Sequence, residues 1–380
     1  MKIVVLRERA QGERRVPLIP PSAEKLVRLG ASVSVECGIG ESIGIPDEAY
    51  ERAGATVESD RMTALKSADL VLRLRKPPLE DIRLLRAGCL HVSLLDPFQT
   101  PELIRALADA GVTAFSLELI PRTTIAQKMD VLSSQANLAG YVAVLMAANR
   151  LDKIFPMMST PAGTIAPARV FVVGAGVAGL QAIATAKRLG AVVEAFDTRP
   201  VVEEQVKSLG AKFLKIDLGE TGQTKDGYAK ALTEEQLRKQ REAMARSCAN
   251  ADVVITTAQV FGKRAPLIIT DEMIRGMKPG SVIVDLAVET GGNVEGSRLD
   301  EEVIIHGVRV LGYGNMPGRV PAHASQMFSS NLANFIEHFW NRETKSFVLN
   351  SEDDIIKGCL VTHNGAVVHP AIQPIVEKKA

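Results

Sequence analysis

The stretch Phe171-Val172-Val173-Gly174-Ala175-Gly176-Val177-Ala178-Gly179 decides the fold that we expect for this chain. An apolar strand leads directly into the spacing Gly-x-Gly-x-x-Gly, and apolar residues at helical intervals follow, namely Leu180, Ile183, Ala184 and Leu189. In such a strand–turn–helix unit, Gly174 makes the tight turn, Gly176 lets the backbone approach a pyrophosphate, and Gly179 lets the helix pack closely on the strand. The amides and dipole at the start of the helix attract phosphate charge. The sequence therefore predicts a dinucleotide-binding site, and a glycine-rich turn without a ligand is the weaker interpretation.

An acidic residue, Asp197, follows Gly174 by 23 residues and comes directly after the next predicted strand, residues 192–196. A carboxylate at this place accepts hydrogen bonds from the adenosine ribose and repels a 2′-phosphate, so we expect NAD rather than NADP. Arg199 is the opposite signal, because an arginine could attract that phosphate. It could also stack on the adenine or be solvated, and the sequence leaves these alternatives open.

Short apolar runs alternate with helical patterns along almost the whole chain, which is typical of α/β proteins with parallel sheets. Strands are predicted in a first group at residues 2–6, 32–36, 70–74, 90–95 and 112–117, and in a second group at 170–173, 192–196, 212–216, 253–256, 282–286 and 308–312. We expect two doubly wound parallel-sheet (Rossmann-like) domains, joined by two long helices at 133–149 and 326–340, with a cleft between them. The predicted domains are residues 1–132 plus 330–380, where the C-terminal tail returns, and residues 133–329.

The composition narrows the function further. The 380 residues are 46% apolar and 23% charged, with a net charge of +1, so the chain lacks the basic field that a nucleic-acid partner needs. The four cysteines are far apart without a Cys-x-x-Cys pair, and the six histidines show no metal-ligand spacing, so we expect no disulfide framework and no metal. No apolar stretch approaches the ~18 residues of a membrane span, and a cytoplasmic location is predicted.

Two polar segments have both a structural and a functional interpretation. In the first, Asp130 can simply cap the helix that follows, or Arg122, Gln127, Asp130 and Ser133 can line the cleft. A guanidinium together with a carboxylate would bind both ends of a nicotinamide carboxamide and fix the face of the ring. The second segment, residues 217–228, is polar and rich in glycine, and is either a lid over the nucleotide or a mobile surface loop.

A family resemblance covers essentially the whole chain. The matching segments are Glu13 to Val16, Arg122 to Asp130, Ser133 to Tyr141, Gly174 to Gly179, Asp197 to Pro200, Asp226 to Lys230, Gln240, Ile255 to Ala258, and Asp285 to Ala287. On these segments the chain resembles the NAD(H)-binding component of proton-translocating NAD(P) transhydrogenases and, more distantly, the alanine dehydrogenases.

The resemblance implies a role for each matching segment. Arg122, Gln127, Asp130 and Ser133 would hold the nicotinamide end, with Gln127 and Asp130 positioning the ring. The pyrophosphate would lie against Gly174, Ala175, Gly176 and Val177, and the adenosine against Asp197, Thr198 and Arg199. Gly227 and Tyr228 would belong to a mobile loop, and Gln240 and Gln259 would make further contacts, the latter through its backbone.

The resemblance also separates two kinds of chemistry. An amino-acid dehydrogenase needs an acid and a base, which alanine dehydrogenases supply with a lysine and a histidine; this chain resembles them but has Arg75 and Leu95 there, and Glu289 where an aspartate is expected. Arg15, which would bind a substrate carboxylate, is retained, and Lys76 adjoins the altered position. Direct hydride transfer between two nicotinamide rings needs only positioning.

The expected function is therefore hydride transfer between NAD(H) on this chain and NADP(H) on a partner subunit, coupled to proton translocation by a membrane-embedded proton-conducting subunit. The resemblance implies a homodimer that is peripheral on the cytoplasmic face of the membrane, and no transhydrogenation without its partner. The alternatives are an alanine dehydrogenase-like, NAD-dependent amino-acid dehydrogenase and a non-catalytic module that senses NAD.

Overall fold

Apolar residues of strand β1 (Lys2–Val5) alternate between the two faces of a sheet, and both faces are buried. Ile3 and Val5 belong to one apolar core, which includes Phe335 of helix α11 (Pro321–His338), whereas Val4 belongs to a second core with Leu107 of α5 (Pro101–Asp109). A strand that is apolar on both sides requires helices on both faces, which is the arrangement of a doubly wound parallel sheet.

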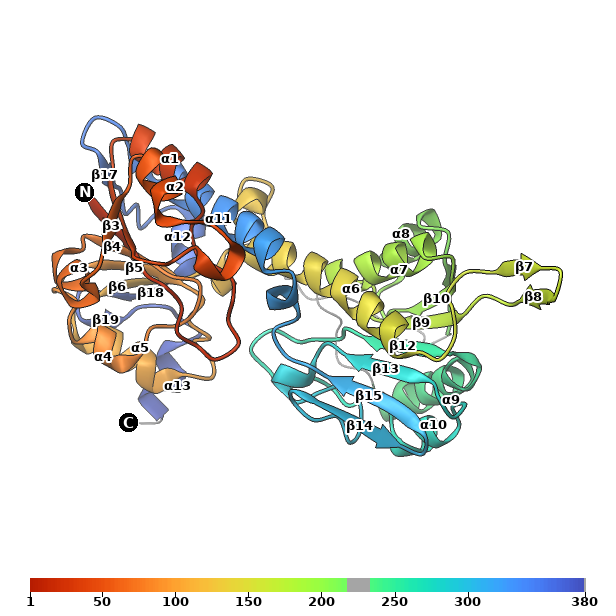
Figure 1. The fold of residues 1–380 in the computed structure, drawn as a ribbon. Helices are drawn as coiled ribbons and strands as arrows, with labels where there is room; N and C mark the ends of the chain where they lie inside the picture. The colour runs from red at the N-terminus through yellow and green to blue at the C-terminus, as the bar shows by residue number, and fades with distance from the viewer. Residues whose placement is uncertain (217–232, 379–380) are drawn as a thin grey trace. The chain divides into compact units, whose positions relative to one another are not determined.

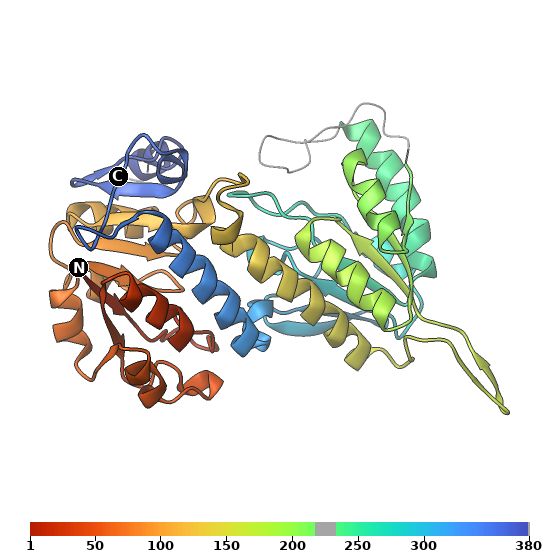
Figure 2. The ribbon, with the colours of Figure 1, turned by 90° about the horizontal axis from the view of Figure 1, so that it is seen from above.

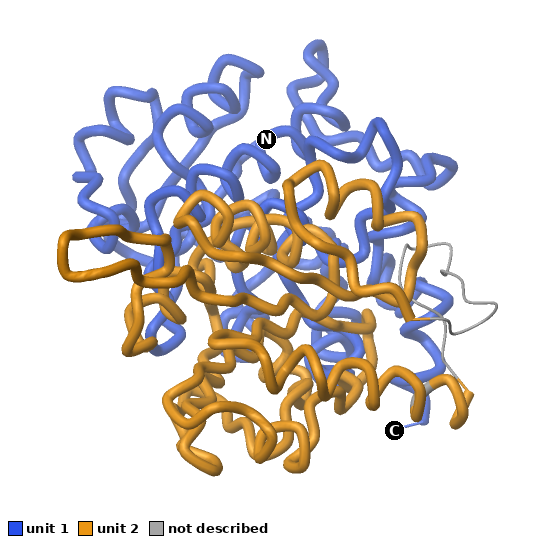
Figure 3. Tube along the Cα trace, turned by 90° about the vertical axis from the view of Figure 1, so that its right-hand side faces the viewer, with its two compact units in different colours: residues 1–135, 318–380 blue, residues 136–317 orange. Residues whose placement is uncertain are grey.

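The computed structural model describes residues 1–216 and 233–378. The chain forms two units, unit 1 with Met1–Gln135 and Gly318–Ala380, and unit 2 with Ala136–Pro317 (Figure 3). Helix α6 (Val131–Arg150) begins in unit 1 and continues into unit 2.

The sheet of unit 1 has eight strands (Figure 1). Their order is β19 (Ala366–Val367), β18 (Leu360–His363), β6 (Thr113–Ser116), β5 (Leu90–Ser93), β4 (Leu70–Leu72), β1, β2 (Ser32–Glu36) and β3 (Thr56–Glu58). The strands from β1 to β6 pair in parallel, whereas β18 pairs antiparallel with β6, so the C-terminal segment completes the sheet of unit 1.

Helices cover both faces of this sheet. The first core contains side chains of α1 (Pro20–Arg28), α11 and α12 (Asp354–Cys359); the second contains side chains of α3 (Arg61–Ser67), α4 (Leu79–Ile82), α5 and α13 (Gln373–Lys378). Unit 1 also contains α2 (Asp47–Arg52), the short 3-10 turns η1 (Glu41–Ile43), η2 (Leu117–Leu119) and η3 (Gln127–Met129), and a small ribbon of β16 (Trp340–Asn341) and β17 (Ser346–Phe347).

The sheet of unit 2 has seven strands and the same winding. Their order is β11 (Lys212–Phe213), β10 (Val192–Phe196), β9 (Arg169–Val173), β12 (Val253–Thr256), β13 (Val282–Asp285), β15 (Val308–Gly312) and β14 (Glu301–Ile305), all parallel except β14. Helix α9 (Glu234–Asn250) and α10 (Asp271–Arg275) share an apolar core with one face, and α7 (Val177–Arg188) packs on β9 and β10. The remaining segments are α8 (Glu203–Ser208) and the turns η4 (Pro200–Val202), η5 (Val288–Thr290) and η6 (Met316–Arg319).

A two-stranded hairpin of β7 (Met158–Thr160) and β8 (Gly163–Ile165) projects from unit 2 (Figure 2). All six of its strand residues are exposed. Neither this hairpin nor the edge strand β14 was predicted from the sequence.

The predicted fold class of two doubly wound domains is confirmed, but three details differ. Helix α11 does not join the units, because its apolar face packs in the core of unit 1, and the chain passes between units before it, at residues 317–318. The predicted boundary at 329–330 is therefore wrong, whereas the other boundary lies at 135–136, three residues beyond the predicted one. The predicted cleft between the domains stays a prediction.

Helix α6 corrects the expectation that no segment is apolar enough for a membrane. Among the residues that the structure describes, it is the one helix whose length and apolar composition would allow it to cross a bilayer. A single helix of this kind is weak support for a membrane span. In unit 2 its Gly140 lies so close to α7 that a Cβ there would be 2.1 Å from the carbonyl oxygen of Ala178. This contact shows that this stretch of α6 is packed against protein.

Candidate functional site

The glycine-rich turn of unit 2 lies where β9 ends and α7 begins. Gly174 has φ +95°, a backbone conformation that glycine adopts without strain, and its amide donates to the Phe196 carbonyl oxygen at 2.8 Å. At Gly179, a Cβ would be 1.8 Å from the carbonyl oxygen of Gly174, so only glycine lets α7 approach the strand this closely. Two of the predicted glycine roles are thus visible in the packing of the turn.

The third glycine opens the turn to a ligand. Helix α7 has Gly176 as its N-cap, and the nearest atom that a Cβ there would meet is Nη2 of Arg199, at 3.9 Å. The first amides of a helix have no partner within the helix, and the first turn of α7 contains no acidic side chain. Open space in front of such amide donors fits a pyrophosphate group.

Asp197 follows β10 and its carboxylate faces this turn. Its Oδ2 accepts hydrogen bonds from the amide of Ala175 at 2.8 Å and from Nη2 of Arg199 at 2.7 Å. Its Oδ1 accepts from the amide and from Nε of Arg199, both at 2.9 Å. The structure therefore brings Asp197 and Arg199 together with the glycine-rich turn, while Thr198 is half-buried between them.

The loop after β12 completes this edge of the sheet. The hydroxyl of Thr257 donates to the carbonyl oxygen of Gly174 at 3.1 Å and so ties the loop to the turn. Asn293 binds the amide and the carbonyl oxygen of Ala258, at 3.0 and 2.8 Å, and its own amide donates to the buried carboxylate of Asp285. Because parallel strands β9, β10, β12 and β13 end at one edge, these groups lie at the point where the strand order reverses, the usual place of a nucleotide site.

Thr257 and Asn293 are positioning residues that the sequence did not reveal. The segments around Thr257 and Asp285 belong to the family resemblance, but no role followed from their residue types. Asn293 comes after two glycines, a pattern that is ordinary for a loop, so only the folded chain shows that it holds Ala258 from both sides.

Two predicted glutamines lie in different settings. Gln240 of α9 is buried, its Nε2 lies 3.5 Å from Sδ of Met244, and its Oε1 has no hydrogen-bond partner among the described residues. A buried amide oxygen without a partner is costly, which fits a predicted contact with a ligand. Gln259 is instead used within the protein, since its Nε2 donates to the carbonyl oxygen of Leu286 at 2.9 Å. This agrees with the expectation that its side chain does not contact the cofactor.

The four residues predicted to hold the nicotinamide lie in unit 1, around the start of α6. Asp130 caps this helix, because its Oδ1 accepts from the amide of Ser133 at 2.9 Å and its Oδ2 from the Ser133 hydroxyl at 2.6 Å. The structural interpretation of Asp130 is therefore confirmed, and it leaves the lone pairs of the Ser133 hydroxyl free to accept. Arg122 and Gln127 are exposed on the preceding loop.

That loop is anchored from within unit 1. Ala126 and Met129 are fully buried in the core, and the carbonyl oxygen of Lys128 accepts hydrogen bonds from Asn331 and Asn334 of α11, at 2.9 and 3.0 Å. The loop thus presents Arg122 and Gln127 from a fixed base.

Arg15 is enclosed by an acidic partner. Its Nε and Nη2 donate to the two oxygens of Glu13, at 2.8 and 2.7 Å, and its Nη1 donates to Oε1 of Gln135 at 2.9 Å. Nε of Arg75 also donates to Glu13, at 2.7 Å. Burial alone would raise the pKa of Glu13, but the hydrogen bonds and charges of Arg15 and Arg75 outweigh it and lower that pKa to about 2. Glu13 therefore occupies the fork of Arg15 that a substrate carboxylate would need.

The remaining predicted features are quickly placed. Leu95, at the position where the resemblance would require a histidine, is fully buried. Gly227, Tyr228 and the predicted lid at 217–228 lie outside the described residues. Within residues 1–216 and 233–378, no three His, Cys, Asp or Glu side chains are grouped so that they could hold a metal ion.

Comparisons with known proteins cover the whole chain. Residues 4–139 match the family described as alanine dehydrogenase/PNT, N-terminal domain, and residues 143–370 match alanine dehydrogenase/PNT, C-terminal domain. The chain is 47% identical to the first portion of the NAD(P) transhydrogenase subunit alpha of Rhodospirillum rubrum, over 98% of this chain and 99% of the relative. The alanine dehydrogenase of Halomonas elongata is 30% identical, over 98% and 96%. The crystal structure of transhydrogenase from Sinorhizobium meliloti is similar with a TM-score of 0.85 and 44% identity, over 98% of this chain and 100% of that one.

Proposed function

The chain belongs to the family of alanine dehydrogenases and NAD(P) transhydrogenases (PNT), and from that premise we propose that it is the NAD(H)-binding subunit of a proton-translocating NAD(P) transhydrogenase. The proposal depends chiefly on the glycine-rich turn with Asp197 beside it, in a chain whose whole length matches transhydrogenase alpha subunits more closely than alanine dehydrogenases. The Asp197 carboxylate favours NAD(H) over NADP(H).

Each portion of the nucleotide has a proposed partner in the chain. The pyrophosphate lies against the amides from Gly174 to Val177, and the adenosine ribose donates to Asp197. Arg122 donates to the carboxamide oxygen of the nicotinamide, and the oxygens of Asp130 and Ser133 accept from its amide group. Gln127 and Asp130 together fix which face of the ring is presented.

When bound, NADH supplies a hydride, and its direct transfer to a second nicotinamide neither releases nor takes up a proton at the reacting carbons. The chain's own residues therefore need to position the ring and need not act as acid or base. The state of Arg15 supports this proposal, because its fork is filled by Glu13. An amino-acid dehydrogenase would require that fork for its substrate.

We further propose that NADP(H) is held by a separate component and that a membrane-embedded subunit conducts protons. The chain has one Gly-x-Gly-x-x-Gly motif, which is enough for one nucleotide, and its relatives are named as subunits. On this proposal the chain catalyses no transhydrogenation by itself and is peripheral on the cytoplasmic face of the membrane.

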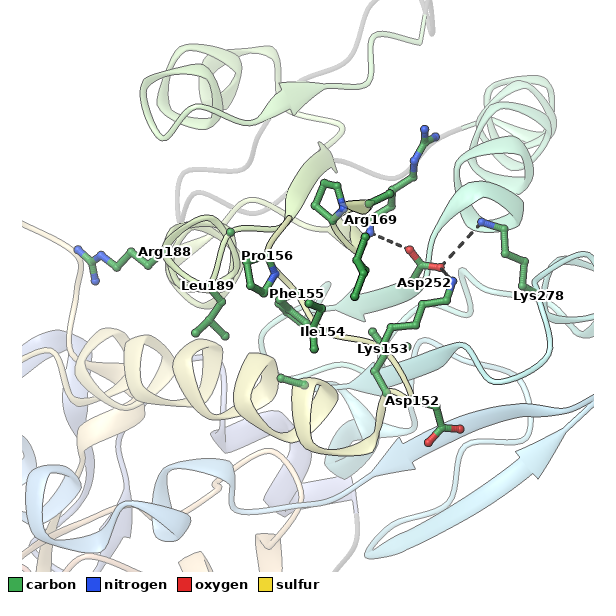
Figure 4. A pocket seen from close by; sticks show the side chains of 16 residues that line it. Asp152, Lys153, Ile154, Phe155, Pro156, Arg169, Arg188, Leu189, Asp252 and Lys278 are labelled. Carbon is green, nitrogen blue, oxygen red and sulfur yellow. Dashed lines mark hydrogen bonds and ion pairs between the residues drawn. The ribbon is translucent and has the colours of Figure 1, made fainter. Parts of the chain in front are cut away.

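A homodimer is supported by the hairpin of unit 2. Met157, Met158 and Ile165 are 65%, 45% and 50% exposed, and their side chains are apolar. At the base of the hairpin is an open groove of about 1300 Å³ with an apolar lining that includes Phe155 and Leu189 (Figure 4). A second copy of the chain offers matching apolar side chains, so we propose that the hairpin of one copy packs on the other.

The dimer is tested by the molar mass in solution. Met158→Asp places a charge on an exposed hairpin position and should convert the dimer to a monomer in light scattering coupled to gel filtration. Leu79→Asp, at a 48% exposed position of α4 in unit 1, is the control and should leave the mass unchanged. A Met158→Asp protein that stays dimeric would place the interface elsewhere.

The function is tested by mixing the purified chain with an NADP(H)-binding transhydrogenase component and following hydride exchange from NADPH to an NAD analogue. We expect exchange in the mixture and none with either protein alone. Reduction of NAD by alanine with this chain alone would identify an amino-acid dehydrogenase. Saturable NADH binding without any exchange would identify a sensing module.

A further inference from the structure

The carboxylate of Asp197 has no acceptor position left for a ligand. It accepts four hydrogen bonds from the protein, two of them from backbone amides and two from the guanidinium of Arg199. A carboxylate offers about four acceptor positions, so all of them are used. The side chains of Asp197 and Arg199 are only 6% and 17% exposed, so water screens the pair weakly.

Only one of these donors can leave without unfolding the site. The amide of Ala175 belongs to the glycine-rich turn, and the amide of Arg199 lies two residues from Asp197 in the same chain segment. The guanidinium, by contrast, is at the end of a flexible side chain. A ribose hydroxyl that donates to Asp197 must therefore take the place of Nε or Nη2 of Arg199.

We propose that Arg199 is a specificity-determining latch on the ribose site, an inference that rests on the proposed NAD(H)-binding function. Binding of the adenosine ribose exchanges two charge-assisted hydrogen bonds of Arg199 for two hydroxyl bonds, so the latch lowers the affinity for NAD(H). The same pairing withholds the guanidinium from the 2′-phosphate of NADP(H). Asp197 thus excludes NADP(H) in two ways, by its own charge and by keeping Arg199 occupied.

Two other roles for Arg199 make different predictions. If Arg199 only stabilised the turn from Asp197 to Pro200, its removal would change the affinities for NADH and NADPH by the same factor. If it stacked on the adenine, its removal would weaken both. The latch alone predicts tighter binding of NADH with no gain for NADPH.

The experiment titrates the full chain with NADH and with NADPH and follows the fluorescence of the reduced nicotinamide. Arg199→Met should tighten NADH binding by roughly tenfold, the effect of one charge-assisted hydrogen bond that hydroxyls replace incompletely. Asp197→Asn should weaken NADH and tighten NADPH, because it frees the guanidinium. The double variant should lose the gain for NADPH, which shows that the two residues act as a pair.

Controls keep the inference separate from the function on which it rests. Arg275→Met removes a comparable arginine, paired with Asp271 on α10, and should change neither affinity. Should Arg199→Met be poorly folded, Arg199→Lys, which keeps the charge but not the fork, should tighten NADH by a smaller factor. NADH affinity that stays the same or falls in the Arg199 variants would overturn the latch. A wild-type chain that does not bind NADH saturably would instead overturn the proposed function.

Discussion

Removal of the charge of Glu13 tests the buried cluster of unit 1 most directly. The side chains of Glu13 and Arg15 are 1% and 5% exposed, so Glu13→Gln leaves a buried guanidinium without its closest counter-ion. Loss of one partner of a buried ion pair typically costs about 3–5 kcal/mol. We expect the free energy of unfolding at pH 7 to fall by at least about 3 kcal/mol.

The pKa of Glu13 gives a second, independent magnitude. Burial raises this pKa, but Arg15 and Arg75 lower it from 4.5 to about 2, and a shift of that size corresponds to about 3 kcal/mol. The folded-state pKa lies below the unfolded one, so this stabilisation is fully present above pH 4.5 and is lost as the pH falls toward 2. The difference between wild type and Glu13→Gln should shrink over that same window.

The assay is urea unfolding followed by tryptophan fluorescence. Trp340 is the single tryptophan of the sequence, it is buried in unit 1, and its Nε1 donates to the Leu29 carbonyl oxygen at 2.8 Å. Its signal therefore reports on the unit that contains Glu13. As a control, Glu352→Gln removes a carboxylate that is 84% exposed and paired with Lys357, and it should cost less than about 1 kcal/mol.

Two results would refute this reasoning about Glu13. One is a loss below about 1 kcal/mol at pH 7, which would mean that Arg15 finds another partner or water. The other is a difference between the two proteins that is as large at pH 3 as at pH 7, since the ionised carboxylate would then not be the stabilising group.

Three further predictions concern the two halves of the nucleotide site. Gly140→Ala places a Cβ against the Ala178 carbonyl oxygen and should destabilise unit 2 by about 1–3 kcal/mol in thermal unfolding; an unchanged melting temperature would contradict the close helix contact. Thr257→Val removes the hydroxyl bond to the glycine-rich turn and should cost about 1 kcal/mol and weaken NADH binding in titrations, whereas Thr257→Ser should retain both. Asp130→Asn and Gln127→Asn should slow hydride exchange with the NADP(H)-binding component far more than they weaken NADH binding, and equal losses would argue against a positioning role.

The sequence predicted the central strands because both of their faces are buried. Strands β9, β12 and β13 are short runs of valine and isoleucine, which cannot be mistaken for loops. Strand β14 was missed because it lies at the sheet edge with two glutamates and only partly buried residues. The hairpin of β7 and β8 was missed for a related reason, since its strands have no buried face in the chain itself.

The site was predictable where its chemistry is local. The glycine spacing and Asp197 follow from a short motif, and the structure brings them together. The pairing of Arg199 with Asp197 was not predicted, because residue types alone do not distinguish a solvated arginine from one that folds back by two positions. The pairing of Arg15 with Gln135 was also beyond prediction, because the two residues are 120 positions apart.

The discontinuous make-up of unit 1 bears on how the chain is synthesised. Its core mixes side chains of residues 3–131 with those of 328–360, and β18 supplies a strand next to β6. Nascent residues 1–135 therefore lack some of their interior until the last segment leaves the ribosome, a delay of roughly 10–50 s at ordinary elongation rates. Unit 2 is continuous and can fold during that interval, so the protein matures from its middle outward, and the exposed early strands are the stage at which a chaperone would be most needed.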